Sequence, residues 1–357
     1  MTALPETGRR AEKSKTCKPQ CIDRRELVSD PRPIKSELKS HRIVWEEEKP
    51  IRWSFLKILR EFSTLKQFYP EINPYVEVYK FRDNLYCMFQ ESMDGMGDLW
   101  MYLLDGPEKA MLIDTGFGVG DLKGLCRHLV GDKPLIVVNT HHHFDHAYGN
   151  AQFDVCYCHE YEVPLMESKN NPHIWDYLFK EDGSCKFTEF DKADIIPWHK
   201  YEIVGVEDGH IFDLGGGYEV EAVLLPGHTP GHCAYYDRRQ HILFQGDTTG
   251  IGSYPGVPNR QYCSVEALRD GLKKLQPRFA EIQGCFPGHG MLDVSSVSLQ
   301  YLLDAAEAIL REPEHCDEKK MRFMAGFGMS KEVMQKYVQQ GTAIKYDMGC
   351  VWKKDVK

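Results

Sequence analysis

Residues 139–150 read NTHHHFDHAYGN and place four histidines and one aspartate within six positions. Burying an imidazole is costly unless the ring is hydrogen-bonded, and clustered histidines repel one another once they are protonated. The cluster is therefore either a polar loop that faces water or a set of ligands that metal ions hold together. It follows PLIVVNT at 134–140, which has the pattern of a buried strand, so the cluster lies where a core strand ends.

The spacing within this segment indicates two metal ions. Residues two apart in an extended segment point the same way, so His141 and His143 can bind one metal ion together. Asp145 and His146 lie just beyond and can reach a second ion a few ångströms away. His142 points opposite to its two neighbours and is expected to pack or to form a hydrogen bond instead.

Three later loops each follow an apolar strand and each offer one further ligand. LLPGHTPGH offers His228, LFQGDTTG offers Asp247 and CFPGHG offers His289. Together with the first segment these make seven nitrogen and oxygen ligands, enough for two divalent ions that share one carboxylate. No thiolate is needed, so zinc is expected, with iron and manganese as alternatives.

HxHxDH followed by GHTPGH, GD and PGHG resembles the metallo-β-lactamase superfamily of hydrolases over roughly residues 75–295. The resemblance implies an α/β fold: a four-layer αβ/βα sandwich of two mixed β-sheets, with helices on both outer sides and the metals at one edge. Asp114 in LIDTG matches an aspartate that supports the metal loop, and His232 of GHTPGH is structural in this pattern. The implied ligands are His141, His143 and His228 for the first metal, Asp145, His146 and His289 for the second, and Asp247 as the bridge.

The reaction expected of such a site is hydrolysis by a hydroxide that bridges the two metals. Two divalent ions about 3.5–4 Å apart lower the pKa of bridging water towards neutrality. Asp145 is the expected catalytic residue, because it can orient the hydroxide and later pass a proton to the leaving group. THHHFDHAYGN and LPGHTPGH resemble both glyoxalase II-like thioesterases and lactonases, so the expected substrate is an ester, thioester or lactone.

Two other activities of the superfamily stay open as alternatives, a phosphodiesterase or nuclease and a β-lactam hydrolase. The bridging position is Asp247, where the lactamases of the superfamily have Cys or Ser. Lactonases of the acyl-homoserine type carry a Tyr shortly after that position, whereas here DTTGIGSY offers only the distant Tyr254. The formal net charge of −9 disfavours a surface that binds phosphate backbones, so no nucleic-acid partner is expected.

The remaining composition indicates a cytoplasmic protein that does not bind membranes. No apolar run approaches the roughly 20 residues that span a bilayer, and MTALPETGRRAEKSK lacks the apolar middle of a secretory signal. The twelve cysteines are scattered, with Cys17/Cys21 and Cys156/Cys158 as the only close pairs. They are expected to be reduced core residues.

Changes in composition and in the spacing of apolar residues divide the chain into four parts. We expect a flexible or wrap-around arm over 1–50, an amphipathic helix and linker over 51–74, the catalytic domain over 75–312, and a C-terminal extension over 313–357 that packs on this domain. Helical spacing of apolar residues runs through 51–68, and its apolar surface could also be buried in a homodimer. An aromatic-rich insertion over 151–200 includes Trp175 and Tyr177, and most of its aromatic residues are expected to pack onto the core. Some of them are expected to line an apolar pocket above the metals, which predicts a small-molecule substrate with a hydrophobic or aromatic group.

Overall fold

The computed structural model describes residues 37–42, 55–252, 256–324, 329–339 and 342–356. The arm expected over 1–50 lies outside the described residues except for 37–42, where β1 (His41–Arg42) pairs with β9 (Thr188–Glu189). No disulfide links the ten cysteines that are described, and Cys17 and Cys21 fall outside these ranges. Within the same ranges, every helix is too short or too polar to span a bilayer.

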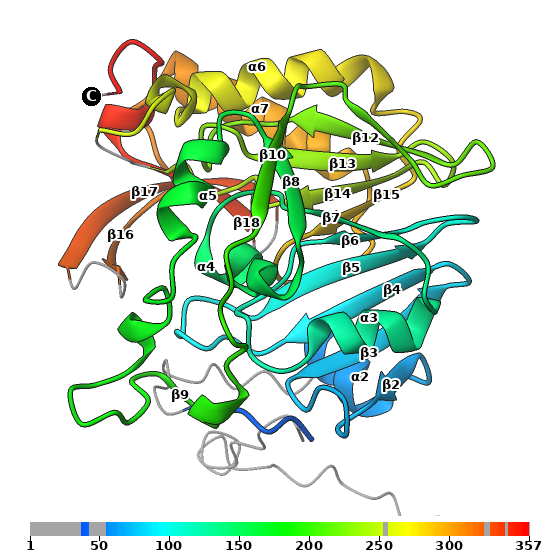
Figure 1. Ribbon diagram of the computed structural model, residues 1–357. Helices are drawn as coiled ribbons and strands as arrows, with labels where there is room; N and C mark the ends of the chain where they lie inside the picture. The colour runs from blue at the N-terminus through cyan, green and yellow to red at the C-terminus, as the bar shows by residue number, and fades with distance from the viewer. Residues whose placement is uncertain (1–36, 43–54, 253–255, 325–328, 340–341, 357) are drawn as a thin grey trace, which may run out of the picture.

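Two mixed β-sheets form the centre of the molecule (Figure 1). The larger sheet has eight strands, in the spatial order β10 (Glu202–Val206), β8 (Val155–His159), β7 (Leu135–Val138), β6 (Ala110–Ile113), β5 (Leu99–Asp105), β4 (Leu85–Gln90), β3 (Val76–Arg82) and β2 (Lys66–Phe68). The smaller sheet has five strands, in the order β11 (Ile211–Asp213), β12 (Glu219–Leu224), β13 (Cys233–Asp237), β14 (Ile242–Gly246) and β15 (Gly284–Pro287). Neighbours among β6, β7, β8 and β10 pair in parallel, as do β14 and β15, and the other pairs are antiparallel.

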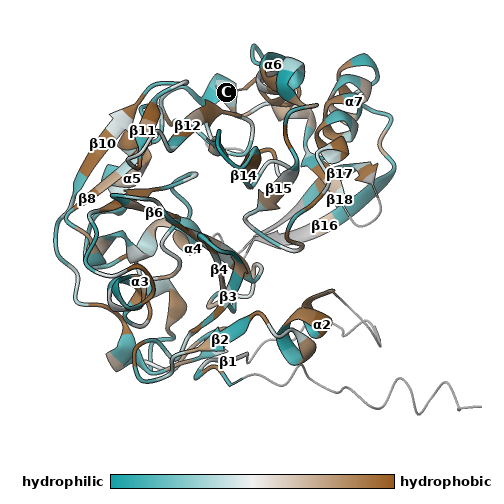
Figure 2. Ribbon diagram, turned by 90° about the vertical axis from the view of Figure 1, so that its right-hand side faces the viewer, coloured by the Kyte–Doolittle hydropathy of each residue, from teal (hydrophilic) through white to brown (hydrophobic). Residues whose placement is uncertain are grey.

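Helices cover the outer side of each sheet, while the two sheets face one another (Figure 2). The helices of the larger sheet are α3 (Leu122–Val130) and α5 (Val163–Lys169), and those of the smaller sheet are α6 (Val265–Leu275) and α7 (Val297–Arg311). This is the αβ/βα sandwich that the motifs predicted, so the expected fold class is confirmed.

Strand β5 shows why the central strands read as unbroken apolar runs. Its sequence LWMYLLD is buried on both faces, because alternate side chains enter different cores. Trp100 and Tyr102 face the smaller sheet, where the Tyr102 ring lies 4.9 Å from that of Phe244 and 5.8 Å from that of Phe286, between ring centroids. Met101, on the other face, packs in the cluster that includes residues of α3.

The helix predicted from the spacing over 51–68 is confirmed at 55–62 and wrong at 66–68, and residues 51–54 lie outside the described residues. Helix α2 (Phe55–Phe62) is present, but β2 (Lys66–Phe68) pairs antiparallel with β3 at the edge of the larger sheet. The helical pattern continues into this segment, but backbone hydrogen bonds to a neighbouring strand decide its conformation. Helix α2 buries Arg60 against this edge.

The chain beyond α7 adds a three-stranded sheet made of β16 (Glu318–Met324), β17 (Met329–Gln339) and β18 (Thr342–Tyr346). Met334, Ile344 and Tyr346 share an apolar cluster with residues of α6 and α7, so this sheet packs on the helices that cover the smaller sheet. The short elements are α4 (Phe144–Ala147), η1 (Tyr148–Gln152), η2 (Asp176–Leu178), η3 (Lys192–Asp194), η4 (Arg260–Tyr262), η5 (Gln276–Arg278) and η7 (Met348–Cys350).

Candidate metal centre

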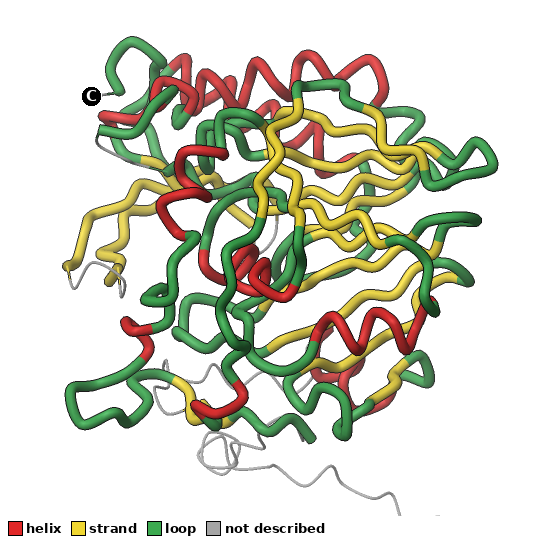
Figure 3. Tube along the Cα trace, in the orientation of Figure 1, coloured by secondary structure: helices red, strands yellow, loops and turns green. Residues whose placement is uncertain are grey.

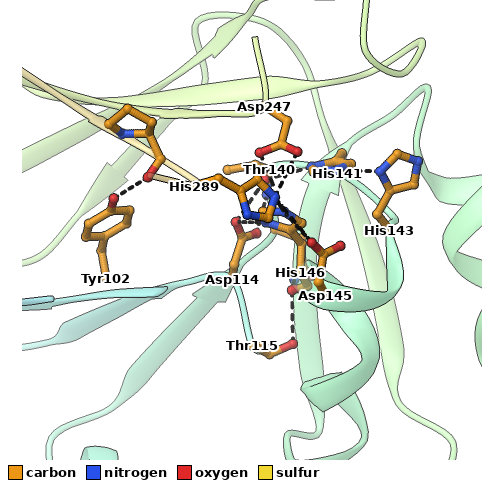
Figure 4. Close-up of polar contacts among 12 residues, drawn as sticks. Tyr102, Asp114, Thr115, Thr140, His141, His143, Asp145, His146, Asp247 and His289 are labelled. Carbon is orange, nitrogen blue, oxygen red and sulfur yellow. Dashed lines mark hydrogen bonds and ion pairs between the residues drawn. The ribbon is translucent and has the colours of Figure 1, made fainter. Parts of the chain in front are cut away.

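The predicted ligand loops meet at one edge of the sandwich (Figure 4). The histidine-rich segment connects β7 to α4, and His228 follows β12. Asp247 and His289 follow β14 and β15, which run parallel, so both residues leave the smaller sheet at the same end. The structure brings all seven predicted side chains together.

The first group consists of His141, His143 and His228. Their ring nitrogens converge, since His143 Nδ1 lies 2.9 Å from His141 Nε2 and 3.0 Å from His228 Nε2. Burial lowers the pKa of His141 and His143 well below the usual range and that of His228 to about 4. These rings are therefore neutral near pH 7, which is the state that a metal ligand requires.

The second group consists of Asp145, His146 and His289. Asp145 Oδ2 lies 3.3 Å from His289 Nε2 and 3.5 Å from His146 Nε2. Asp247 lies between the two groups: its Oδ1 is 3.6 Å from His146 Nε2, and its Oδ2 is 3.1 Å from His289 Nε2 and 3.6 Å from His228 Nε2. One carboxylate thus faces both groups.

These residues fit divalent cations on two observations. Within each of three overlapping sets, the ligand atoms lie within 4.8 Å of one another. The ring nitrogens His141 Nε2 and His143 Nδ1 face one another and can share only one proton. Asp247 Oδ1 is buried with no hydrogen-bond partner among the described residues. Cations held by these nitrogens and oxygens would give every one of them a partner.

Protonation of the second group differs from that of the first. Burial alone would lower the pKa of His146, but the negative charges of Asp145, Asp114 and Asp247 outweigh it and raise this pKa to about 9. Burial likewise opposes ionisation of Asp247, yet the charges of His289 and His146 hold its pKa well below the usual range. His146 would therefore have to give up a proton to hold a divalent ion.

Asp114 holds the histidine-rich segment in place, as predicted. It adopts a left-handed backbone conformation, with φ +64°, at the end of β6. Its carboxylate accepts hydrogen bonds from Thr140 N at 2.7 Å, from Thr140 Oγ1 at 2.9 Å and from His146 Nδ1 at 2.7 Å. The last contact turns His146 Nε2 towards the centre.

Backbone carbonyl groups orient two other ligands in the same way. His228 Nδ1 lies 2.6 Å from Gly250 O, and His289 Nδ1 lies 2.7 Å from Asp98 O, so each ring presents Nε2 to the centre. His232 is structural, because its Nδ1 lies 2.8 Å from Leu225 O while its Nε2 accepts a hydrogen bond from the backbone N–H of Asp247.

Glu162 is the residue that sequence reasoning missed. It is fully buried just beyond β8, and its carboxylate joins two of the ligand loops. It accepts hydrogen bonds from His142 N at 3.0 Å and from Gly231 N at 2.8 Å, and its Oε2 lies 2.6 Å from His142 Nδ1. His142 thus forms the hydrogen bond that its position predicted. No sequence signal distinguishes Glu162 from its exposed neighbour Glu160.

Glu162→Gln is expected to weaken metal binding by about 10- to 100-fold. Burial opposes ionisation of Glu162, but the charge and hydrogen bond of His142 lower its pKa, so the substitution removes a charged acceptor that holds both loops. Metal titration of the apo-protein measures this change. Glu160→Gln is the matched control, and equal affinities for the two variants would contradict the assigned role.

Most aromatic side chains of 151–200 pack this segment onto the sandwich. From Asn170 to Tyr201 the chain runs mostly as loop (Figure 3). Trp175 is buried, and its Nε1 donates a hydrogen bond to Phe117 O at 2.7 Å. Tyr177 differs, because its ring lies 5.7 Å, between centroids, from that of Phe144, which sits between two predicted ligands.

Comparison with known proteins identifies related hydrolases. Acyl-coenzyme A thioesterase MBLAC2 of Bos taurus is 28% identical over 209 residues, which cover 53% of this chain and 72% of that protein. A hydroxyacylglutathione hydrolase of Synechococcus sp. is 27% identical over 183 residues, which cover 50% of this chain and 61% of that protein. A solved metallo-beta-lactamase from Pontibacter korlensis is 18% identical, with a TM-score of 0.47 over 65% of this chain and 99% of that one.

A sequence model of the Metallo-beta-lactamase superfamily matches residues 95–314. This match spans well over half of the chain and contains every predicted ligand. The relatives include a hydroxyacylglutathione hydrolase, which agrees with the glyoxalase II-like branch that the motifs resembled. The chain therefore belongs to the metallo-beta-lactamase superfamily and is a hydrolase of that superfamily.

Proposed function

We propose that this protein is a dinuclear metal-dependent hydrolase of thioesters, with esters and lactones as the related bonds that its site could also cleave. The observation that carries this proposal is the carboxylate of Asp247, which faces both groups of ligands. Two relatives support the choice of bond, because one is named an acyl-coenzyme A thioesterase and the other a hydroxyacylglutathione hydrolase. Zinc is the metal that we propose, since the ligands are imidazoles and carboxylates without a thiolate.

Bound divalent ions would supply acidified water and polarise the substrate carbonyl. The protein's own contribution is to hold protons and ligands in place. Asp145 is buried, and the charge of His146 helps to keep its pKa below the usual range despite that burial, so it is an ionised base. In the proposed reaction its carboxylate accepts a proton from the attacking water and returns it to the leaving thiolate.

A substrate panel tests this proposal. The full chain, reconstituted separately with zinc, iron and manganese, is assayed on thioesters, esters, lactones, β-lactams and phosphodiesters, with His141→Ala as the blank. We expect two ions per chain, and thioester hydrolysis that is lost in the blank. Activity on phosphodiesters or β-lactams alone would overturn the choice of substrate. Homodimer formation and a cytoplasmic location stay predictions.

A further inference from the structure

The C-terminal sheet reaches the metal centre through its edge strand β18. Ile344 and Tyr346 of this strand pack in the apolar cluster on α6 and α7, and β17 pairs with one edge of the strand. Gln335 of β17 lies opposite Lys345, but its carbonyl accepts a hydrogen bond from Asp317 N at 2.9 Å, on the side away from β18. The backbone N–H and C=O of Lys345 therefore point to the other edge of β18.

The segment 249–252, which follows the predicted bridging ligand, lies along that edge. Lys345 N donates a hydrogen bond to Thr249 O at 2.9 Å, and Ile251 N donates one to Lys345 O at 2.8 Å. Gly250 is thereby paired with Lys345 in a parallel bridge. The loop that leaves β14 is thus attached to the C-terminal sheet by two backbone hydrogen bonds.

The alternate backbone groups of the 249–252 segment hold the loop of His228. Gly250 O lies 2.6 Å from His228 Nδ1, and Gly252 N donates a hydrogen bond to Gly227 O at 3.0 Å. The fit is close, because a Cβ atom at position 250 would lie 3.2 Å from His228 Nδ1. A shift of this segment would therefore move the ring whose Nε2 faces the centre.

Resting on the proposed function, in which the first group of ligands holds an ion, we propose that Lys345 is a positioning residue of the metal centre. Its backbone fixes the 249–252 segment, and that segment orients His228. A ligand that is oriented before the ion arrives needs less ordering when the ion binds, so affinity is higher. Lys345 lies outside residues 95–314, the part of the chain that matches the superfamily.

The first test compares zinc binding to the apo forms of Lys345→Pro and Lys345→Ala. Both variants lack the lysine side chain, but only the proline variant lacks the N–H that bonds to Thr249 O. Lys345→Pro should bind one of its two zinc ions about 3- to 10-fold more weakly than Lys345→Ala, which is the loss of one hydrogen bond. Competition with a chromophoric chelator measures the affinity and the number of ions. Equal affinities would overturn the proposal.

Ala343→Pro is the matched control. Ala343 lies two residues earlier in β18, so its N–H points to the same edge, but it forms no backbone hydrogen bond to residues 249–252, all of which the structure describes. This variant should lower Tm about as much as Lys345→Pro and should bind zinc as the wild type does. Equal weakening of zinc binding in both proline variants would assign the effect to the stability of the sheet and refute the role of Lys345.

The second test needs no substitution. If the backbone of Lys345 favours the metal-binding orientation of His228, a bound ion must favour the docked Lys345 to the same degree. Adding zinc to the wild-type apo-protein should therefore slow hydrogen exchange at the amides of Lys345 and Ile251 more than at those of β16, on the far side of the same sheet. Equal slowing in β16 would contradict the proposal.

The outcomes for the proposed function are separate. A protein that binds zinc but cleaves no thioester would refute the proposed substrate, and the same two tests would still decide the role of Lys345. A wild-type protein that binds no zinc would refute both.

Discussion

Asp247→Asn is expected to remove most of the metal binding and to lower kcat/KM by about 10³-fold, equivalent to several kcal/mol of transition-state stabilisation. Asp247 faces both groups, with contacts to His146, His228 and His289. The amide has almost the same shape as the carboxylate but carries no charge, so the loss reports on metal binding rather than on packing. Metal content per chain and steady-state kinetics on the best thioester measure it.

Asp237→Asn is the matched control for this experiment. Asp237 is a buried aspartate of the same sheet, at the end of β13 remote from the metal centre, where it accepts hydrogen bonds from Tyr218 and Gln240. This variant should lose stability while keeping its metal and its kcat/KM. An Asp247→Asn protein that retained two ions and full activity would refute the bridging role.

Arg60→Leu is expected to lower the free energy of unfolding by about 3 kcal/mol, because it leaves a buried carboxylate without its main partner. Arg60 lies on α2, and its Nε and Nη2 form hydrogen bonds of 2.8 and 2.9 Å to the two carboxylate oxygens of Glu77 on β3. Both side chains are almost fully buried. Lys66 Nζ at 3.1 Å and Tyr79 Oη at 2.7 Å still contact Glu77 in the variant. The loss of stability therefore lies at the lower end of the range for breaking a buried ion pair. Urea denaturation measures the change.

The pH dependence of the destabilisation in Arg60→Leu distinguishes an unpaired buried carboxylate from a simple loss of packing. Burial raises the pKa of Glu77, but the hydrogen bonds and charge of Arg60 outweigh it, so the pKa lies below the ordinary value of 4.5. The pair therefore stabilises the wild type above that value, and this contribution is lost as the pH falls through the folded pKa. In Arg60→Leu burial should raise the pKa of Glu77 above 4.5, so the destabilisation should shrink as the pH is lowered and the carboxylate becomes protonated.

Two further variants complete this test. Arg238→Leu removes an exposed pair with Glu219 and Glu221, and should cost only about 0–1 kcal/mol. Arg60→Leu combined with Glu77→Leu should recover much of the lost stability, because neither member of the buried Arg60–Glu77 pair is then left without the other. A double variant as unstable as Arg60→Leu would show that packing, and not the unpaired charge, explains the effect.

Much of the candidate metal centre could be predicted because its geometry is local. His141 and His143 are two positions apart in an extended segment, so their shared direction follows from backbone geometry. Asp247 and His289 each follow an apolar strand, and strand ends are rigid places from which side chains reach a common edge. A divalent metal ion also needs nitrogen, oxygen or sulfur donor atoms, which limits the candidate ligands to a few residue types.

The fold could be predicted where burial alone decides the structure, as in β5, whose unbroken apolar run reflects burial on both faces. The fold could not be predicted where a segment with a helical pattern can instead form backbone hydrogen bonds to a neighbouring strand. The segment 66–68 continues a helical pattern but forms β2, because the exposed edge of β3 offers it backbone hydrogen bonds. The charged residue Arg60 lies within this helical pattern, but it is buried against Glu77.

The sequence by itself determined which side chains gather at the candidate metal centre, because their atoms, their spacing and their places at strand ends are all encoded in short segments. Only the tertiary structure decided what holds and surrounds these side chains: the carboxylate of Glu162 between two loops, the carbonyl of Asp98 behind His289 and the ring of Tyr177 against Phe144. These contacts join residues far apart in the chain, and they leave no periodic pattern. Every residue has a backbone carbonyl, so the sequence does not indicate which carbonyl orients a histidine, and only the folded structure shows it.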